Sequence, residues 1–139
     1  HVVKDRTCDC MAASDLLICK SGTATLEAAV IGTPMVIVYR GTPIMRLEYR
    51  LRRHELEEFI GMPNILAGRE ICPEFLNEEV TAERLASAAL DILNDPTRLA
   101  RMRESLAEVR KSLGEPGAVE RAARAVLEMG GLAVESPER

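Results

Sequence analysis

The residue types best suited to holding a ligand fall in one short stretch of the chain, KSGTATLE. Gly22 lets a ligand approach the backbone closely, and the free N–H groups of a helix that begins there can bind an anion. Ser21, Thr23 and Thr25 add hydroxyl groups to the same turn. Glu27 lies one turn further on, where its carboxylate can accept hydrogen bonds from vicinal hydroxyls. A phosphate at the turn and a ribose beside the carboxylate would together describe a nucleotide site.

The same residues also have a purely structural interpretation. Serine and threonine at the start of a helix usually act as caps for its unpaired N–H groups. A glutamate in the first turn usually complements the helix dipole. The choice between the two interpretations depends on the elements that surround the stretch.

Those elements are a strand, a helix and a second strand. Residues 15–19 (DLLIC) and Met35–Tyr39 (MVIVY) are short apolar runs typical of buried parallel strands. Thr23–Ile31 lies between them, is rich in helix formers and is followed by Gly32 and Pro34, which end a helix. The sequence therefore predicts a βαβ unit in an α/β fold. The stretch KSGTATLE then lies at the carboxyl end of a parallel sheet, where such folds bind ligands.

Shorter segments flank this unit. Residues 2–3 are expected to form an edge strand, and residues 11–13 to lie in a small helix. Residues 61–64 (GMPN) combine glycine, proline and asparagine in the manner of a loop. Residues 66–70 then form a turn into another element, which stops at Pro73.

Residues 42–59 predict a helix with two distinct sides. By the 3.6-residue period, Ile44, Leu47 and Leu51 fall on one side and three arginines fall on a neighbouring side. Basic residues beside apolar ones suit a surface that contacts a membrane or a lipid phosphate. A solvated helix face packed on the sheet explains the same pattern equally well. The three arginines are Arg46, Arg50 and Arg53.

The rest of the chain is predicted to be helical. Helices are expected over residues 81–93, 95–113 and 116–129, with Pro96 and Pro116 in first-turn positions. We therefore expect a single partial domain. It has an α/β core in residues 1–80, C-terminal helices in residues 81–130 and a frayed tail in residues 131–139.

Composition excludes several classes of protein. The 139 residues, 47% of them hydrophobic and 29% charged, suit one ordinary globular domain. The formal charge of −4 argues against a protein that binds nucleic acid by general electrostatic attraction. A chain with no Trp, two Tyr and two Phe also lacks the aromatic residues of a base-stacking platform. The longest apolar runs fall far short of the roughly 20 residues that a membrane helix requires.

The four cysteines carry little signal. Cys8 and Cys10 form a C-x-C pair, Cys19 lies in an apolar run and Cys72 precedes Pro73. No second pair and no nearby histidine completes a zinc site. We expect unpaired thiols, and the sequence predicts neither a metal nor a cofactor.

Two blocks of sequence carry a specific resemblance. Residues 13–40 (ASDLLICKSGTATLEAAVIGTPMVIVYR) and 63–76 (PNILAGREICPEFL), in this order, resemble the C-terminal part of the lipid-A-disaccharide synthase family. The resemblance continues more weakly through the C-terminal helices. It implies a Rossmann-like, parallel-sheet half of a GT-B glycosyltransferase fold. A more distant relative is the peptidoglycan glycosyltransferase that adds N-acetylglucosamine, whose comparable turn has one extra residue before its glutamate.

The reaction implied by this resemblance is a hexosyl transfer in lipid A biosynthesis. The group 2,3-diacylglucosamine moves from its UDP derivative to 2,3-diacylglucosamine 1-phosphate, which gives a β-1,6-linked disaccharide and UDP. Ser21, Gly22 and Thr23 would lie near the diphosphate. Glu27 would hold the ribose. The residues that would complete the donor site are Tyr39, Arg40, Asn64, Arg69 and Glu70.

Arg69 and Glu70 allow two interpretations. The guanidinium of Arg69 could pair with a phosphate in a bidentate way, or it could lock Glu70 in place. A structural Arg–Glu pair that pins a loop explains the two residues equally well.

Parts of the family pattern would lie before His1. These are the glycine-containing LPGSR loop and the N-terminal domain, so we interpret the chain as part of a longer protein. The N-terminal domain should provide the acceptor site and the general base, and neither His1 nor His54 is a substitute. We therefore assign no catalytic residue and expect no transfer by this part alone.

The resemblance also implies partners and a location. We expect a cytoplasmic protein, peripheral to the inner membrane, that binds the two acylated sugars and no nucleic acid. Residues 116–129 present an apolar stripe whose usual partner in GT-B enzymes is the N-terminal domain. We therefore expect a homodimer, unless the three C-terminal helices fold back over the sheet. The stripe comprises Val119, Ala122, Ala123, Val126 and Leu127.

Two other functions stay open on the sequence alone. One is a non-catalytic nucleotide-sugar-binding or interaction module. The other is part of an enzyme that resembles UDP-N-acetylglucosamine epimerase, although the block PNILAGRE is not expected there.

Overall fold

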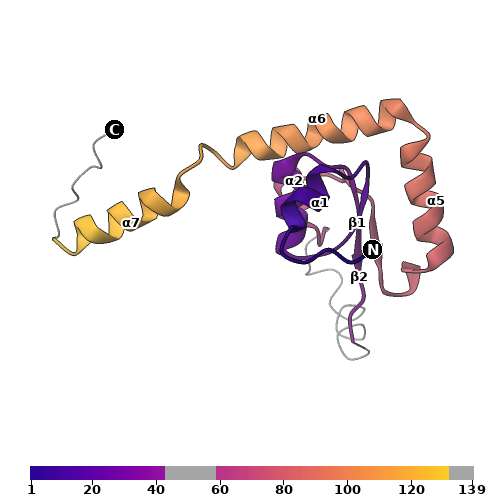
Figure 1. The fold of residues 1–139 in the computed structure, drawn as a ribbon, viewed down its shortest axis with the longest axis horizontal. Helices are drawn as coiled ribbons and strands as arrows, with labels where there is room; N and C mark the ends of the chain where they lie inside the picture. The colour runs from indigo at the N-terminus through magenta and orange to yellow at the C-terminus, as the bar shows by residue number, and fades with distance from the viewer. Residues whose placement is uncertain (43–58, 132–139) are drawn as a thin grey trace.

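The computed structural model describes residues 1–42 and 59–131. In this part of the chain, α-helices surround a sheet of three parallel strands in the order β1-β2-β3 (Figure 1). The α/β fold with a parallel sheet is therefore confirmed. The elements are α1 (Thr7–Ala12), β1 (Leu17–Lys20), α2 (Thr23–Ile31), β2 (Met35–Tyr39), α4 (Met62–Ala67), β3 (Glu74–Leu76), a 3-10 helix (Asn77–Glu79), α5 (Ala82–Leu93), α6 (Pro96–Ser112) and α7 (Ala118–Met129).

The predicted βαβ unit is confirmed. Helix α2 and strand β2 have the bounds expected from the sequence, and β1 is displaced by one or two residues from the expected strand. Gly32 ends α2 with a φ of 91°, a conformation that glycine adopts without strain. Leu17 pairs with Met35 and Lys20 with Val38, so β1 and β2 run side by side in the same direction.

Strand β2 is the centre of the sheet. Met35, Val36 and Ile37 are all fully buried, which explains why this strand reads as a continuous apolar run rather than an alternating one. Strand β1 pairs with β2 alone in the described sheet, and its Ile18 is 55% exposed. The sheet therefore has one well-covered middle strand and a more open edge.

Helices pack on the sheet from more than one direction. Helix α2 contacts α1, α4 and α6, while α5 contacts β2. In Figure 1, α1 and α2 lie on one side of the strands, α5 lies on the other, and α6 runs across both. All these elements share one core, which comprises Met11, Ala28, Ala29, Met35, Val36, Ile37, Ile71, Cys72, Ile92, Met102, Leu106 and Val109.

The segment before β3 differs from its prediction. Residues 61–64 open helix α4 rather than forming a loop, so that prediction was wrong. Pro63 is in the first turn of α4, where its missing N–H costs no helical hydrogen bond. Strand β3 was not predicted at all. Nor do residues 2–3 form the expected edge strand, since Val2 is 94% exposed and outside any strand.

Two of the three predicted C-terminal helices pack on the core. Helix α5 contributes Ile92 and α6 contributes Leu106, both fully buried. Helix α7 contributes no buried residue and stands apart from the rest at the far end of Figure 1. The idea that all three helices fold back over the sheet is therefore wrong for α7.

The predicted basic helix lies mostly outside the described residues, as do its Arg46, Arg50 and Arg53. Across residues 1–42 and 59–131, no helix is both long enough and apolar enough to span a bilayer.

Candidate functional site at the carboxyl edge of the sheet

The carboxyl ends of the three strands lie along one edge of the sheet. Lys20 of β1 pairs with Val38 of β2, and Tyr39 of β2 pairs with Leu76 of β3. The turn that follows β1 and the residues that follow β2 therefore meet at this edge. In open α/β sheets this is the edge that binds ligands.

The turn after β1 is held in place from two sides. The amide of Ser21 donates to the carbonyl of Val38 at 2.9 Å, and its hydroxyl donates to the carbonyl of Ile60 at 2.7 Å. Gly22 then has φ 154° and ψ −165°, a backbone region that is essentially restricted to glycine. A Cβ at this position would meet no atom within 4 Å. The turn needs glycine for its backbone conformation and leaves open space above it.

Helix α2 begins at this turn with unpaired amides. Gly22 is its N-cap, so no side chain caps the helix. Within the described residues, the amides of Thr23 and Ala24 make no hydrogen bond. These N–H groups and the positive end of the helix dipole favour an anion at the exposed turn.

Thr25 faces inward rather than toward this open space. Its side chain is buried, and its hydroxyl donates to the carbonyl of Gly22 at 2.7 Å. This hydroxyl was expected to face a ligand. The structure gives it the role of fixing the turn that the glycine begins.

Glu27 is exposed on the same side of α2 as Thr23, four residues earlier. Both residues line a shallow cavity of about 400 Å³ between α1 and α2. Burial raises the pKa of the Cys19 thiol, and the nearby Glu27 carboxylate raises it further. Glu27 is thus an exposed residue whose charge acts on the Cys19 thiol of β1. The other residues that line the cavity are Cys8, Leu26, Val30 and Ile31.

Tyr39 ends β2 at the same edge, and Arg40 directly follows the strand. Tyr39 is partly buried and Arg40 is exposed. The chain beyond them is fixed by Asn77, whose side-chain oxygen accepts from the amide of Gly41 at 3.0 Å. Asn77 is buried and has a φ of 51°. No sequence pattern selects Asn77, because its role depends on a contact 36 residues away.

Asn64 lies below the surface. It is fully buried, and its side-chain oxygen accepts from the amides of Ile71 at 2.8 Å and Cys72 at 2.9 Å. Its amide group donates at 2.7 Å to both the carbonyl of Cys72 and the carboxylate of Glu74. The side chain of Asn64 is thus used to join α4 to the segment that leads into β3.

Glu74 is a residue that the sequence reasoning missed. Its two carboxylate oxygens accept from the amides of Ile60 and Gly61, each at 2.8 Å, and from Asn64. Helix α4 has no side-chain cap at its N-cap Gly61, so Glu74 supplies the cap from β3. An acidic residue in a short apolar strand was the signal available in the sequence.

Arg69 and Glu70 lie at the opposite edge of the sheet. They precede β3, whereas Ser21, Gly22 and Tyr39 end or follow strands that run in the same direction. The structure therefore does not bring Arg69 and Glu70 together with the turn after β1. The reason is directional, because β3 carries the chain from the amino edge, where these two residues are, toward the carboxyl edge.

Arg69 does not lock Glu70 either. Its Nη2 donates to the hydroxyl of Ser105 and to the carboxylate of Glu108, each at 3.1 Å. Both partners belong to α6. Arg69 therefore ties the end of α4 to α6.

No metal site is evident in the part of the chain that the structure describes. It contains no group of three His, Cys, Asp or Glu residues close enough to hold an ion. Cys8 and Cys10 both lie in α1, where residues two apart point to nearly opposite sides of the helix. Their spacing does not bring the two thiols together.

Comparisons with known proteins identify the family. Residues 1–129 match the family model described as lipid-A-disaccharide synthetase. The chain is 44% identical over 123 residues to a lipid-A-disaccharide synthase of Synechocystis sp., covering 88% of the chain and 31% of that protein. It is 41% identical over 129 residues to that of Geobacter metallireducens, covering 92% of the chain and 33% of the relative. The chain thus spans about a third of the length of these relatives. It belongs to the lipid-A-disaccharide synthetase family.

Proposed function

We propose that this chain is the donor-binding part of a lipid-A-disaccharide synthase. In the full-length protein, 2,3-diacylglucosamine would be transferred from its UDP derivative to 2,3-diacylglucosamine 1-phosphate. One observation carries the proposal: an exposed glycine turn lies at the carboxyl edge of a parallel sheet, one turn from an exposed carboxylate. The first amides of the helix that begins there have no hydrogen-bond partner within residues 1–42 and 59–131. Family membership supports the choice of a glycosyltransferase.

The diphosphate of the donor would bind at residues 21–23. There the amides of Thr23 and Ala24 have no hydrogen-bond partner among the described residues, and Gly22 leaves room for close approach. Glu27 would accept hydrogen bonds from the two ribose hydroxyls, because its carboxylate is exposed on the same side of α2 as Thr23. Binding UDP in this way would hold the sugar beyond the edge of the sheet, where its anomeric carbon can meet an acceptor.

The other residues expected in the donor site fall into three groups according to where the structure places them. Tyr39 and Arg40 lie at the carboxyl edge and would complete the donor site. Thr25 and Asn64 are buried, and their side chains are hydrogen-bonded to other groups of the protein. We therefore assign them positioning roles. Arg69 and Glu70 have no place in this donor site, because they lie at the other edge.

The complete reaction requires more than this chain shows. We propose that the acceptor site and the general base are supplied by the part of the full-length protein that corresponds to the other two-thirds of the relatives. The acylated substrates would place the protein on the cytoplasmic side of the inner membrane. Arg46, Arg50 and Arg53 are candidates for contact with its anionic surface.

Titration of the chain with UDP by calorimetry tests the donor site. Glu27→Ala should weaken UDP binding by roughly ten- to a hundredfold, because charge-assisted hydrogen bonds contribute about 1.5–3 kcal/mol. Glu104→Ala removes an equal charge from the exposed side of α6 and should leave the affinity unchanged. A folded chain that binds no UDP, or a Glu27→Ala variant with unaltered affinity, would contradict the proposal.

A second titration separates the proposal from its alternatives. UDP and UDP-N-acetylglucosamine should compete for one site in a glycosyltransferase or an epimerase-like enzyme, whereas an interaction module should bind neither. Assay of the full-length protein with both acylated sugars then distinguishes transfer from epimerisation.

We further propose that α7 mediates self-association. Val119 is 78% exposed and Val126 is 69% exposed, and α7 has no buried residue. An amphipathic helix with its apolar stripe in water favours association with a second copy through helix exchange or helix packing.

A further inference from the structure

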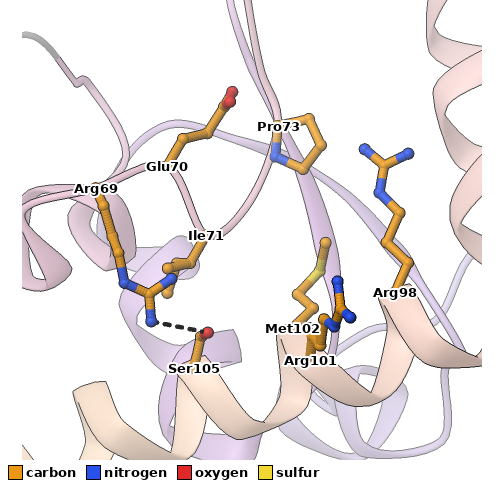
Figure 2. Close-up of a pocket in the computed structure, with 8 residues that line it drawn as sticks. All are labelled: Arg69, Glu70, Ile71, Pro73, Arg98, Arg101, Met102 and Ser105. Atoms are coloured by element: carbon orange, nitrogen blue, oxygen red, sulfur yellow. Dashed lines mark hydrogen bonds between the residues drawn. The ribbon is translucent and has the colours of Figure 1, made fainter.

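A second cavity lies at the amino edge of the sheet, away from the proposed donor site. It has a volume of about 210 Å³ and is formed between the connection from α4 to β3 and the first half of α6 (Figure 2). Pro73 and Ile71 line it from the connection, and Met102 lines it from α6. Since a water molecule occupies about 30 Å³ in the liquid, the cavity can hold a polyatomic ligand group.

One wall of this cavity carries two arginines of α6. Arg98 and Arg101 are three residues apart, so their side chains rise from the same face of the helix, as Figure 2 shows. Like charges at this spacing disfavour the helix. Within the described residues, neither arginine makes an ion pair with a carboxylate. Two adjacent cations thus face the cavity, and no carboxylate of the described residues neutralises them.

A third arginine approaches from the opposite wall. The Nη2 of Arg69 donates to the hydroxyl of Ser105 at 3.1 Å, as Figure 2 shows. It also donates to the carboxylate of Glu108 at 3.1 Å. A guanidinium has five N–H donors, so this contact leaves others for a ligand. The bond to Ser105 brings Arg69 to the same cavity as Arg98 and Arg101.

The floor and rim favour an anion. Ile71 and Met102 are buried, so the floor of the cavity is apolar. Among the described residues that line it, Glu70 is the single acidic one, against three arginines. In Figure 2 its carboxylate points away from Arg69 and Ser105. Guanidinium groups above an apolar floor bind oxyanions more strongly than they do in open water, because the local dielectric is lower.

We propose that Arg69, Arg98, Arg101 and Ser105, here called the α6 anion site, bind a phosphate group. The paired N–H groups of an arginine guanidinium can donate two parallel hydrogen bonds to phosphate oxygens, and Ser105 adds a hydroxyl donor. The phosphate would belong either to a free phosphate compound or to a phospholipid headgroup. The proposal does not depend on the donor site, because the two sites lie at opposite edges of the sheet.

Titration of the isotope-labelled 139-residue chain with inorganic phosphate, followed by NMR at constant ionic strength, tests the site. Phosphate should shift the amide signals of Ile71, Met102 and Ser105 in a saturable way. Arg98→Gln/Arg101→Gln should weaken this binding by about tenfold or more. Arg103→Gln/Arg124→Gln changes the net charge equally at exposed positions outside the cavity and should leave the binding within about twofold of the original.

Sedimentation with vesicles identifies the source of the phosphate. Vesicles with phosphatidylglycerol are compared with vesicles of phosphatidylcholine alone, for the chain and both double variants. Loss of phosphatidylglycerol binding in Arg98→Gln/Arg101→Gln alone would assign the site to a lipid headgroup. Loss of phosphate binding without any vesicle binding would assign it to a free phosphate compound.

Three results would overturn the proposal. The original chain could bind neither phosphate nor anionic vesicles. The two double variants could lose affinity equally, which would indicate a general charge effect. Phosphate could shift only the amides of Gly22 and Thr23, which would assign binding to the donor site instead.

Discussion

The carboxylate of Glu74 accepts a hydrogen bond from the amide of Gly61 at 2.8 Å, and so a residue of β3 caps a helix whose N-cap lies 13 positions earlier. The same carboxylate also accepts from Ile60 and from Asn64. Three donors around one partly buried carboxylate make Glu74 the link between α4 and the sheet.

Replacement of Glu74 by alanine should destabilise the fold. The change leaves three donors without their acceptor, at an expected cost of about 3 kcal/mol in the free energy of unfolding. Glu74→Gln should cost less, because one acceptor oxygen remains. Urea denaturation followed by circular dichroism measures both values. Glu104→Ala at an exposed position is the control, and an equal loss in Glu74→Ala and the control would contradict the role given to Glu74.

Replacing Gly61 by any larger residue should lower the stability of the fold, because the space around its Cα is already filled. Its φ of −86° and ψ of 129° suit alanine, but a Cβ there would collide with Cδ1 of Ile37 and lie 2.8 Å from Glu74 Oε1. Gly61→Ala should therefore cost about 1–3 kcal/mol through overpacking.

The variant Ile37→Val provides the matched test, since it removes the colliding atom. Alone it should cost about 1 kcal/mol. Combined with Gly61→Ala it should cost less than the sum of the two single changes, by about 0.5 kcal/mol or more. Additive effects would show that the contact with Ile37 does not limit this position.

Cys72 should make the fold less stable in alkaline solution. Burial raises the pKa of its thiol from 9.0 to about 12, with smaller contributions from Glu74 and Glu70. Between these two values the unfolded chain loses a proton that the folded chain keeps. Stability should therefore fall as the pH rises above about 9, by at most about 1.4 kcal/mol per pH unit from this group.

Urea denaturation between pH 8 and pH 10.5 checks this expectation, because the thiol of the unfolded chain loses its proton within this range. Cys72→Ala should show a shallower decline than the original chain. Parallel declines in the two proteins would mean that other groups govern the alkaline transition.

Helix α7 should make the chain associate at micromolar concentration. Light scattering should give a mass above the 15.3 kDa of one chain, and Val119→Ser/Val126→Ser should restore the monomer. Glu120→Ser/Arg124→Ser keeps the net charge and should leave the association intact. A mass of one chain at all concentrations would rule out the dimer.

The sequence was sufficient for elements whose signals are local. Helix α2 lies between a glycine turn and Gly32, and β2 is a continuous β-branched run, so both were predicted with the correct bounds. Helix α4 and β3 were missed because their signals are not local. The cap of α4 comes from Glu74, and β3 has only three residues after Pro73.

Among the candidate site residues, too, some could be predicted from local sequence and others could not. Ser21, Gly22 and Glu27 could be chosen from the type of turn in which they lie. The position of Arg69 could not, because it depends on the direction in which the unpredicted β3 runs. Likewise Thr25 and Asn64 have ligand-type side chains, and only the packing shows that their hydrogen bonds are made within the protein.

The cap that Glu74 gives to α4 also determines how this region opens. Helix α4 has only six residues, too few to persist alone, and its first turn is completed by a strand that follows it in the chain. We therefore expect the helix and β3 to form and open as one cooperative unit. Exchange of the Ile60 and Gly61 amides with solvent deuterium then reports the separation of β3 from β2 rather than the fraying of a helix end.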